Sequence, residues 1–253
     1  MIETQNIEGV AVVKLGRGVI NAINIEMVNK LGEAMKAVRE DAGISALVLA
    51  SASDKFFSMG FDVPELIKLD RPGMEEFVIA YDDLCLDIYA FPKPVVASVN
   101  AHAIAGGCIL ALCCDYRFIA DGRCLMGLNE AKLGVPLPYL ASRVLEKTAG
   151  SSNAREMAYT GDLYQPGELL RMQVVDGIFP PERVFEESVE KARLLGSMPR
   201  EAFAAIKRDR AEETTSLFEA NCHKKHRVFL DCWFSGPTRL LLAEAAEKFA
   251  PKS

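Results

Sequence analysis

Histidine and tryptophan are scarce in this 253-residue chain, which holds three histidines and one tryptophan. Two of the histidines, His223 and His226, lie in a basic run that is typical of a solvated helix face, and the seven cysteines lack the paired spacing of a zinc site. Basic residues number 29 against 35 acidic ones, and the resulting net charge of -6 disfavours binding to nucleic-acid phosphates. The sequence therefore predicts neither a metal site nor a nucleic-acid partner.

Long apolar runs are also absent. No segment approaches the roughly 20 consecutive apolar residues that a membrane-spanning helix needs, and the first six residues lack the basic and apolar parts of a secretory signal. An odd number of cysteines, in a chain long enough to bury a large core, indicates reduced thiols. We therefore expect a cytoplasmic protein without a membrane partner.

Apolar strands and amphipathic helices alternate through most of the chain. Short apolar runs predict strands over residues 10–13, 44–50 and 95–99. Asn24 and Asp62 each precede a helical pattern and are predicted to be N-caps, which for Asp62 is favoured over a role as a catalytic acid. This alternation is typical of an α/β chain.

The pattern changes near residue 196, after which no further strand is predicted. Three helices are predicted there, over residues 199–210, 211–234 and 237–249. Their apolar residues exceed what a free appendage would expose, so we expect these helices to pack on the core and between subunits. The sequence thus predicts a core over residues 1–195 and a helical region over residues 196–253.

Two glycine-containing turns stand where a strand is expected to pass into a helix. Gly60 permits a sharp bend that leaves nearby amides free to face an anion. Gly106 and Gly107 precede a segment that is apolar on all sides, so its helix would begin inside the protein without an acidic cap. An incoming oxyanion would satisfy those amides. The alternative is that the two glycines only permit close packing.

Glu130 is a single acid in an apolar neighbourhood that begins at Met126. Most glutamates are solvated, so a charge on the surface is one interpretation of Glu130. If Glu130 is instead buried in an apolar cleft, desolvation raises its pKa toward that of a useful general base. A serine or cysteine triad is disfavoured, because His102 is the only histidine expected in the core.

Several motifs, in this order, resemble the crotonase family, which is the enoyl-CoA hydratase and isomerase superfamily. The principal ones are Phe57–Asp62, Lys93–Asn100 leading to Ala105–Cys108, and Gly127–Glu130. Ile20–Asn24 and Gly161–Asp176 resemble further family segments. The likeness runs from about Val10 to Pro180, and the helical tail fits it more loosely.

The resemblance implies an α/β fold, the crotonase (ClpP-like) spiral of ββα units with a C-terminal helical oligomerisation region, assembled as a homotrimer or a dimer of trimers. It also implies an acyl-CoA thioester as substrate, with no cofactor beyond the CoA of the substrate. By position, the amides of Phe61 and Gly106 would form an oxyanion hole, and Glu130 would be the catalytic acid–base. The substrate-binding positions would be Ala22, Ser58, Met59, Gly60, Asp62, Ile109 and Asn129.

One position departs from the hydratases of this family, which carry two glutamates. The first of these positions is Ile109 here, and isoleucine cannot hold a water molecule. Moving a double bond needs only one base, which removes a proton at C2 and returns it at C4. Motifs including Cys114–Arg117 and Gly127–Gly134 likewise resemble the Δ3,Δ2-enoyl-CoA isomerase branch.

The sequence therefore predicts an isomerase. A hydratase, another crotonase-type acyl-CoA enzyme and a catalytically silent acyl-CoA-binding protein remain alternatives. Met59 stands where the family more often has alanine, which leaves the acyl chain length open.

Overall fold

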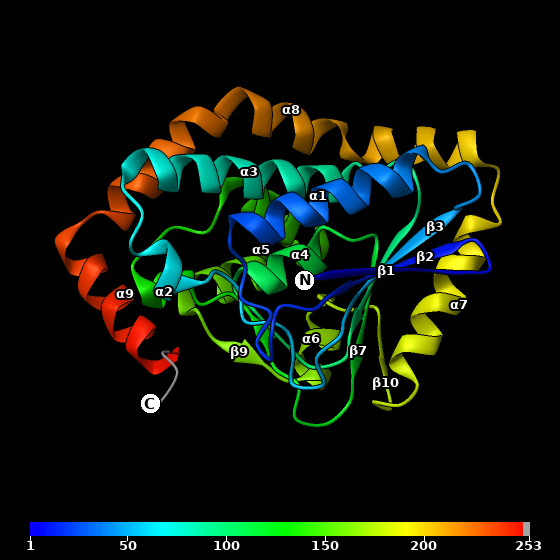
Figure 1. Cartoon of the computed structure of the whole chain (residues 1–253), viewed down its shortest axis with the longest axis horizontal. Helices are drawn as coiled ribbons and strands as arrows, with labels where there is room; N and C mark the ends of the chain where they lie inside the picture. The colour runs from blue at the N-terminus through cyan, green and yellow to red at the C-terminus, as the bar shows by residue number, and fades with distance from the viewer. Residues whose placement is uncertain (250–253) are drawn as a thin grey trace.

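Two β-sheets form the centre of the chain in a computed structural model that describes residues 1–249 (Figure 1). The larger sheet has the order β1-β2-β3-β5-β7-β10, and the smaller one has the order β4-β6-β8-β9. Only β1 in the larger sheet and β9 in the smaller one run antiparallel to their neighbours. The strands are β1 Ile2–Ile7, β2 Val10–Leu15, β3 Ala46–Ser51, β4 Phe56–Ser58, β5 Val95–Val99, β6 His102–Ile104, β7 Tyr116–Ala120, β8 Met126–Gly127, β9 Leu163–Tyr164 and β10 Gly177–Phe179.

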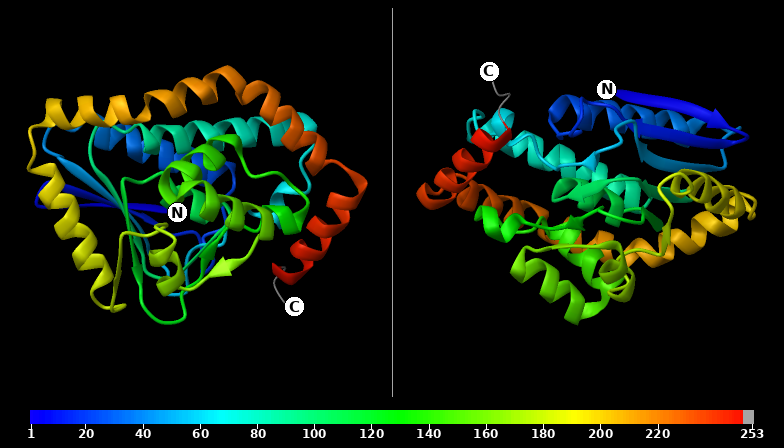
Figure 2. Two further views of the ribbon diagram at one scale, coloured as in Figure 1. Left: turned by 180° about the vertical axis from the view of Figure 1, so that it is seen from behind. Right: turned by 90° about the horizontal axis from the view of Figure 1, so that it is seen from below.

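Helices surround both sheets, as Figure 2 shows from two further sides. They are α1 Ile25–Glu40, α2 Val63–Leu66, α3 Arg71–Tyr89, α4 Gly106–Leu112, the 3-10 helix η1 Glu130–Leu133, α5 Tyr139–Thr160, α6 Pro166–Arg171, α7 Val184–Gly196, α8 Arg200–Trp233 and α9 Gly236–Phe249. None of the helices in residues 1–249 combines the length and apolar character needed to cross a membrane.

From β3 to β8, successive strands alternate between the two sheets. β3 enters the larger sheet, β4 the smaller one, and α2 and α3 follow; β5, β6 and α4 repeat this order, as do β7, β8 and the helices after them. Each repeat adds one parallel strand to each sheet beside the strand of the repeat before it, at the usual spacing of about 4.8 Å. The chain is therefore a spiral of strand–strand–helix units.

The larger sheet is buried on both faces, which explains its uninterrupted apolar strands. Val13 and Leu49 belong to the main hydrophobic core. Val12 and Val48 point to the opposite face, where Val189 and Ala192 of α7 cover them. Because helices cover both sides, no face of these strands alternates with polar residues.

Both predicted N-caps are confirmed. The side chain of Asn24 accepts a hydrogen bond from the Met27 amide at 3.0 Å, and that of Asp62 accepts one from the Glu65 amide at 3.1 Å. Asp62 also pairs with Arg17 at 2.6 Å. The carboxyl group of Asp62 is thus engaged in holding the start of α2.

The last quarter of the chain corrects two predictions. The expected break between residues 210 and 211 is wrong, because α8 runs unbroken from Arg200 to Trp233 and contains neither glycine nor proline. His226 is not on a solvated face either: its Nε2 lies 2.8 Å from Oδ2 of Asp82, and both side chains are buried between α8 and α3. The pairing follows from the packing of α8 along α3 (Figure 1).

The C-terminal helices cover one end of the spiral. α8 lies along α3, and α9 turns back to pack against α2 and η1 (Figure 1). Trp233 and Leu242 are each 1% exposed, so this region contributes to the core of the chain itself. The boundary at residue 195 and the role in oligomerisation stay predictions, and residues 250–253 of the predicted helical region lie outside the described part.

Candidate active site

Three loops meet at one edge of the smaller sheet. Parallel strands β4, β6 and β8 are neighbours there, so their carboxyl ends lie side by side. The loop after β4 carries Met59 and Phe61, that after β6 carries Ala105 and Gly106, and that after β8 leads into Glu130. Ligand sites of open α/β sheets commonly lie at such an edge. The spiral thus brings together residues that are up to about seventy positions apart.

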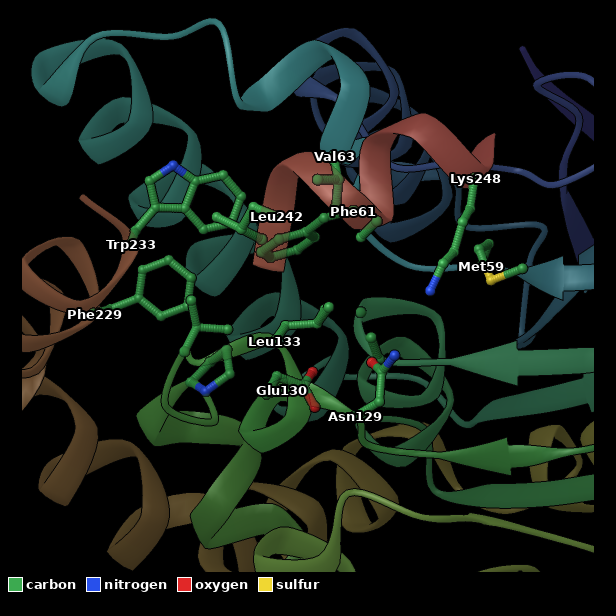
Figure 3. A pocket seen from close by; sticks show the side chains of 15 residues that line it. Met59, Phe61, Val63, Asn129, Glu130, Leu133, Phe229, Trp233, Leu242 and Lys248 are labelled. Atoms are coloured by element: carbon green, nitrogen blue, oxygen red, sulfur yellow. The ribbon is translucent and has the colours of Figure 1, made fainter. Parts of the chain in front are cut away.

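A cavity of about 240 Å³ opens at this edge, with a mostly apolar wall (Figure 3). Its lining residues are Met59, Phe61, Val63, Ala105, Gly106, Asn129, Glu130, Leu133, Val135, Pro138, Phe229, Trp233, Leu242, Ala245 and Lys248. Glu130 is the only carboxylate among them, and Lys248 the only cation. The cavity therefore offers one titratable acid in apolar surroundings.

Glu130 begins η1 and is buried, with 7% of its surface exposed. Its Oε2 is buried and has no hydrogen-bond partner within the described residues. Desolvation by this burial raises the pKa of Glu130 to about 7. A carboxyl group with that pKa is suited to accept and return a proton near neutral pH.

Asn129 lies beside Glu130, and Figure 3 shows the amide of one and the carboxyl group of the other side by side at the cavity. Oδ1 of Asn129 is likewise buried and receives no hydrogen bond from residues 1–249. Buried polar atoms are nearly always paired, so two unpaired acceptors at one cavity indicate a place for a ligand or water.

Two backbone amides at the cavity have no partner. Among residues 1–249, neither the Phe61 nor the Gly106 amide donates a hydrogen bond to a protein group, although both residues line the cavity. Their neighbours are engaged: the Gly60 amide donates to Oγ of Ser58 at 3.1 Å, and the Ala105 amide donates to the Gly127 carbonyl at 2.8 Å. The free amides stand where the glycine-containing turns of the sequence predicted them.

Close backbone packing brings the two amide-bearing segments together. Gly60 has a φ of +93°, and a Cβ built on it would lie 3.0 Å from the Gly106 nitrogen. A Cβ on Gly107 would lie only 2.4 Å from the Ser58 carbonyl oxygen. Gly107 is therefore required by packing, which was the alternative interpretation of the glycine pair, while Gly106 carries one of the free amides.

The predicted site residues divide into two groups. Phe61, Gly106, Glu130, Met59 and Asn129 line the cavity. The remaining predicted residues, which do not line it, are Ala22, Ser58, Gly60, Asp62 and Ile109.

The second group lies outside the wall, where its members have structural roles. The Ser58 hydroxyl donates to the Asn21 carbonyl at 2.7 Å while accepting from Gly60, and so shapes the turn before Phe61. Asp62 caps α2, and the Ala22 carbonyl accepts from Arg17 at 2.9 Å. Ile109 is 1% exposed and packs in the core, because every residue of α4 is buried.

Residues of the C-terminal helices were missed at the cavity. Phe229 and Trp233 of α8 stack with ring centroids 6.0 Å apart, and Leu242 and Lys248 of α9 complete the wall (Figure 3). The available signal was the single tryptophan of the chain, in an otherwise polar helix. The apolar character of a tryptophan predicts that it is buried, but it does not predict that the residue lines a cavity.

Within the part of the chain that the structure describes, no three His, Cys, Asp or Glu side chains gather as possible metal ligands. All seven cysteines are unpaired thiols, and five of them are buried. Burial raises the pKa of Cys108 and of Cys85, which keeps these thiols protonated.

Comparison with known proteins agrees with this geometry. The profile of the enoyl-CoA hydratase/isomerase family matches residues 5–236. The chain belongs to this family. The expectation of a crotonase spiral with a C-terminal helical region is thereby confirmed.

Relatives of this enoyl-CoA hydratase/isomerase family protein carry both activities in their names. Enoyl-CoA delta isomerase 1 of mouse mitochondria is 31% identical over 189 residues, which are 74% of this chain and 65% of the mouse protein. A probable enoyl-CoA hydratase of Rhizobium meliloti is 30% identical over 199 residues, which are 78% of this chain and 75% of that protein. Identity alone therefore does not separate the two reactions.

Among solved structures, the crystal structure of human mitochondrial Δ3-Δ2-enoyl-CoA isomerase matches with a TM-score of 0.94 and 26% identity, covering 98% of this chain and 97% of that one. An enoyl-CoA hydratase from Mycobacterium marinum matches with a TM-score of 0.83 and 25% identity, covering 90% of this chain and 99% of that one. By sequence and by fold the chain is thus a member of the enoyl-CoA hydratase/isomerase family.

Proposed function

We propose that the protein is a Δ3,Δ2-enoyl-CoA isomerase, which converts a 3-enoyl-CoA into the 2-trans-enoyl-CoA. One observation carries the proposal: a single buried carboxylate, Glu130, faces an apolar cavity next to two unpartnered backbone amides. Isomerisation requires one proton acceptor that can return the proton, and one place for negative charge. The cavity supplies both.

In the proposed reaction, the Glu130 carboxylate removes a proton from C2 of the substrate. The electron pair moves into the thioester, whose oxygen becomes negatively charged, and the amides of Phe61 and Gly106 donate to that oxygen. Glu130 then returns the proton to C4 as the double bond shifts to C2–C3. Each oxyanion donor of this kind contributes about 10²–10³ in rate, and no further cofactor takes part.

The rest of the cavity fits an acyl-CoA. The apolar wall formed by Leu133, Trp233 and Leu242 suits an acyl chain, and water in such surroundings is unfavourable. Lys248 is exposed, and its positive charge suits the phosphates of CoA. Asn129 adds one amide group beside Glu130 to orient the acyl portion.

Hydration of 2-enoyl-CoA is the second candidate, because hydratases are among the relatives at a similar identity. Hydration needs a water molecule that is held beside the double bond. Among the described residues the wall carries no second carboxylate, and the family resemblance places Ile109 where hydratases have their first glutamate. This difference favours isomerisation.

A panel of 3-enoyl- and 2-enoyl-CoA substrates of several chain lengths, assayed in parallel for isomerisation and hydration, tests the proposal. We expect isomerisation of 3-enoyl-CoA to exceed hydration of 2-enoyl-CoA in kcat/KM by at least about tenfold. Hydration that exceeds isomerisation would reverse the assignment. Binding of acyl-CoA without either reaction would identify a silent binding protein.

We also propose that the chain assembles as a homotrimer or a dimer of trimers. Tyr159, Ile206 and Leu240 are 78%, 62% and 69% exposed, and large exposed apolar side chains favour association. Light scattering at micromolar concentration tests this: a mass near three or six times 27.7 kDa is expected, and a stable monomer would contradict it.

A further inference from the structure

One side chain outside the cavity contacts both segments that carry the free amides. The Tyr81 hydroxyl of α3 donates to the Gly106 carbonyl at 2.6 Å. Its ring meets the Phe61 ring edge to face, with centroids 4.8 Å apart and planes at 88°. Tyr81 thus connects the loop after β4 with the beginning of α4.

Tyr81 does not reach the cavity itself. It is 1% exposed and is not among the lining residues. Burial raises the pKa of its hydroxyl well above the ordinary value, so the group stays a protonated donor at every working pH. Any influence of Tyr81 on a bound thioester must therefore pass through Phe61 and Gly106.

The segment that Tyr81 holds begins in a strained turn and leads into a short helix. Ala105, just before Gly106, has a φ of +49°, a strained value for a residue with a side chain. α4 spans only seven residues, and no side chain caps its first turn. Gly106 also sits tightly between its neighbours, since a Cβ on it would lie 3.0 Å from the Phe61 ring and 3.2 Å from the Tyr81 oxygen.

We propose that Tyr81 is a positioning residue that fixes the spacing of the Phe61 and Gly106 amides, through its hydrogen bond to one segment and its ring contact with the other. This inference rests on the proposed role of the two amides as the oxyanion hole. Such donors act only within about 2.7–3.1 Å of the developing charge. A misplacement of about 1 Å can lower the rate by about 10².

The test is Tyr81→Phe, which keeps the ring and removes the hydroxyl. We expect kcat for 3-enoyl-CoA to fall by about tenfold while KM changes less than about twofold, because donors that act mainly on the transition state are displaced. Tyr164→Phe is the matched control: its hydroxyl lies 3.2 Å from Oγ1 of Thr160, and Tyr164 does not line the cavity. The control should retain wild-type kcat.

A second readout does not depend on turnover. Infrared difference spectra of bound butyryl-CoA, labelled with ¹³C at the thioester carbonyl, report the hydrogen bonding of that oxygen in a ligand that has no double bond to move. In the wild type we expect the carbonyl stretch at lower frequency than in water. In Tyr81→Phe the stretch should move part of the way back toward its frequency in water. In Tyr164→Phe its frequency should stay as in the wild type.

The outcomes separate this inference from the proposed function. A wild type that polarises the carbonyl without isomerising 3-enoyl-CoA would refute the isomerase proposal alone, and the spectra would still decide on Tyr81. A Tyr81→Phe protein with wild-type kcat and carbonyl frequency would overturn the role of Tyr81. The role of Tyr81 would also be overturned if circular dichroism showed that Tyr81→Phe fails to fold. It would likewise be overturned if the wild type left the frequency of the bound carbonyl stretch as it is in water.

Discussion

The loops of the spiral and the two C-terminal helices contribute different chemistry to the same cavity. The loops after β4, β6 and β8 contribute the buried carboxylate of Glu130, the Asn129 amide and both free backbone amides. Helices α8 and α9 contribute apolar side chains and one exposed lysine. Adjacent strand ends therefore hold the reacting groups, while the shape available to a substrate depends on the two C-terminal helices.

The largest expected effect lies in the loops. Glu130→Gln keeps the size of the side chain but removes the proton acceptor, so isomerisation should fall by at least about 10³-fold while acyl-CoA binding is retained. Steady-state kinetics and calorimetric titration measure the two properties. Glu156→Gln, an exposed change on α5, is the control. A Glu130→Gln protein that kept more than about a tenth of the rate would exclude Glu130 as the base.

Gly107→Ala should affect stability where the loops pack most tightly. The new Cβ would lie 2.4 Å from the Ser58 carbonyl oxygen, and backbone atoms at that distance must move apart. We expect the free energy of unfolding to fall by about 2–3 kcal/mol, as is common for overpacked cores. Urea unfolding measures this, with Gly167→Ala as the control because a Cβ there meets no atom within 4 Å. Equal stability of both variants would contradict the close packing.

Ile109→Glu tests whether the missing carboxylate decides between the two reactions. In a folded variant the ratio of hydration to isomerisation should rise by about tenfold, because a second carboxylate can hold water. A carboxylate placed among the buried residues of α4 should also lower stability by a few kcal/mol. Ile109→Gln controls for size, and assembly mass and circular dichroism establish folding. An unchanged ratio would show that Ile109 does not decide between hydration and isomerisation.

Trp233→Phe addresses the helices, where the expected effect concerns substrate choice. A smaller ring lengthens the apolar end of the cavity, so kcat/KM for an eight-carbon substrate relative to a four-carbon one should rise by about fivefold. Val228→Ala, at a position of α8 that is 46% exposed, should leave this ratio unchanged. If this ratio of kcat/KM values changed only in loop variants, the C-terminal helices would not be what sets the shape available to the substrate.

The smallest effect is the response to pH. Because the pKa of Glu130 is raised to about 7, the ionised base and hence kcat/KM should increase severalfold as pH rises through 7. The free energy of unfolding should change in the opposite direction. Between pH 4.5 and 7 the folded protein keeps the Glu130 proton, whereas the unfolded chain releases it at the ordinary pKa of 4.5. The contribution of Glu130 to the free energy of unfolding is therefore lost as pH rises from 4.5 through 7. Thermal unfolding of wild type and Glu130→Gln across this range measures it. Parallel melting curves would refute the raised pKa.

Much of the fold could be predicted from local pattern. The strands of the larger sheet are apolar throughout because both faces are buried, and Asn24 and Asp62 cap their helices as their positions indicate. β1 was missed because it is a polar edge strand, with four of its six residues exposed. Motif order was sufficient to identify the family, which the profile over residues 5–236 confirms.

Local sequence identifies the groups available for chemistry: one glutamate in an apolar segment, two glycine-containing turns before helices, and no metal-ligand pattern. Which of these groups meet depends on the tertiary structure. Burial of Glu130 raises its pKa, and that burial arises only when distant segments pack around one cavity, which no local pattern encodes. The contact of Tyr81 with both Phe61 and Gly106 likewise exists because the spiral stacks strands that are distant in the chain, so their ends and the helix above them become neighbours.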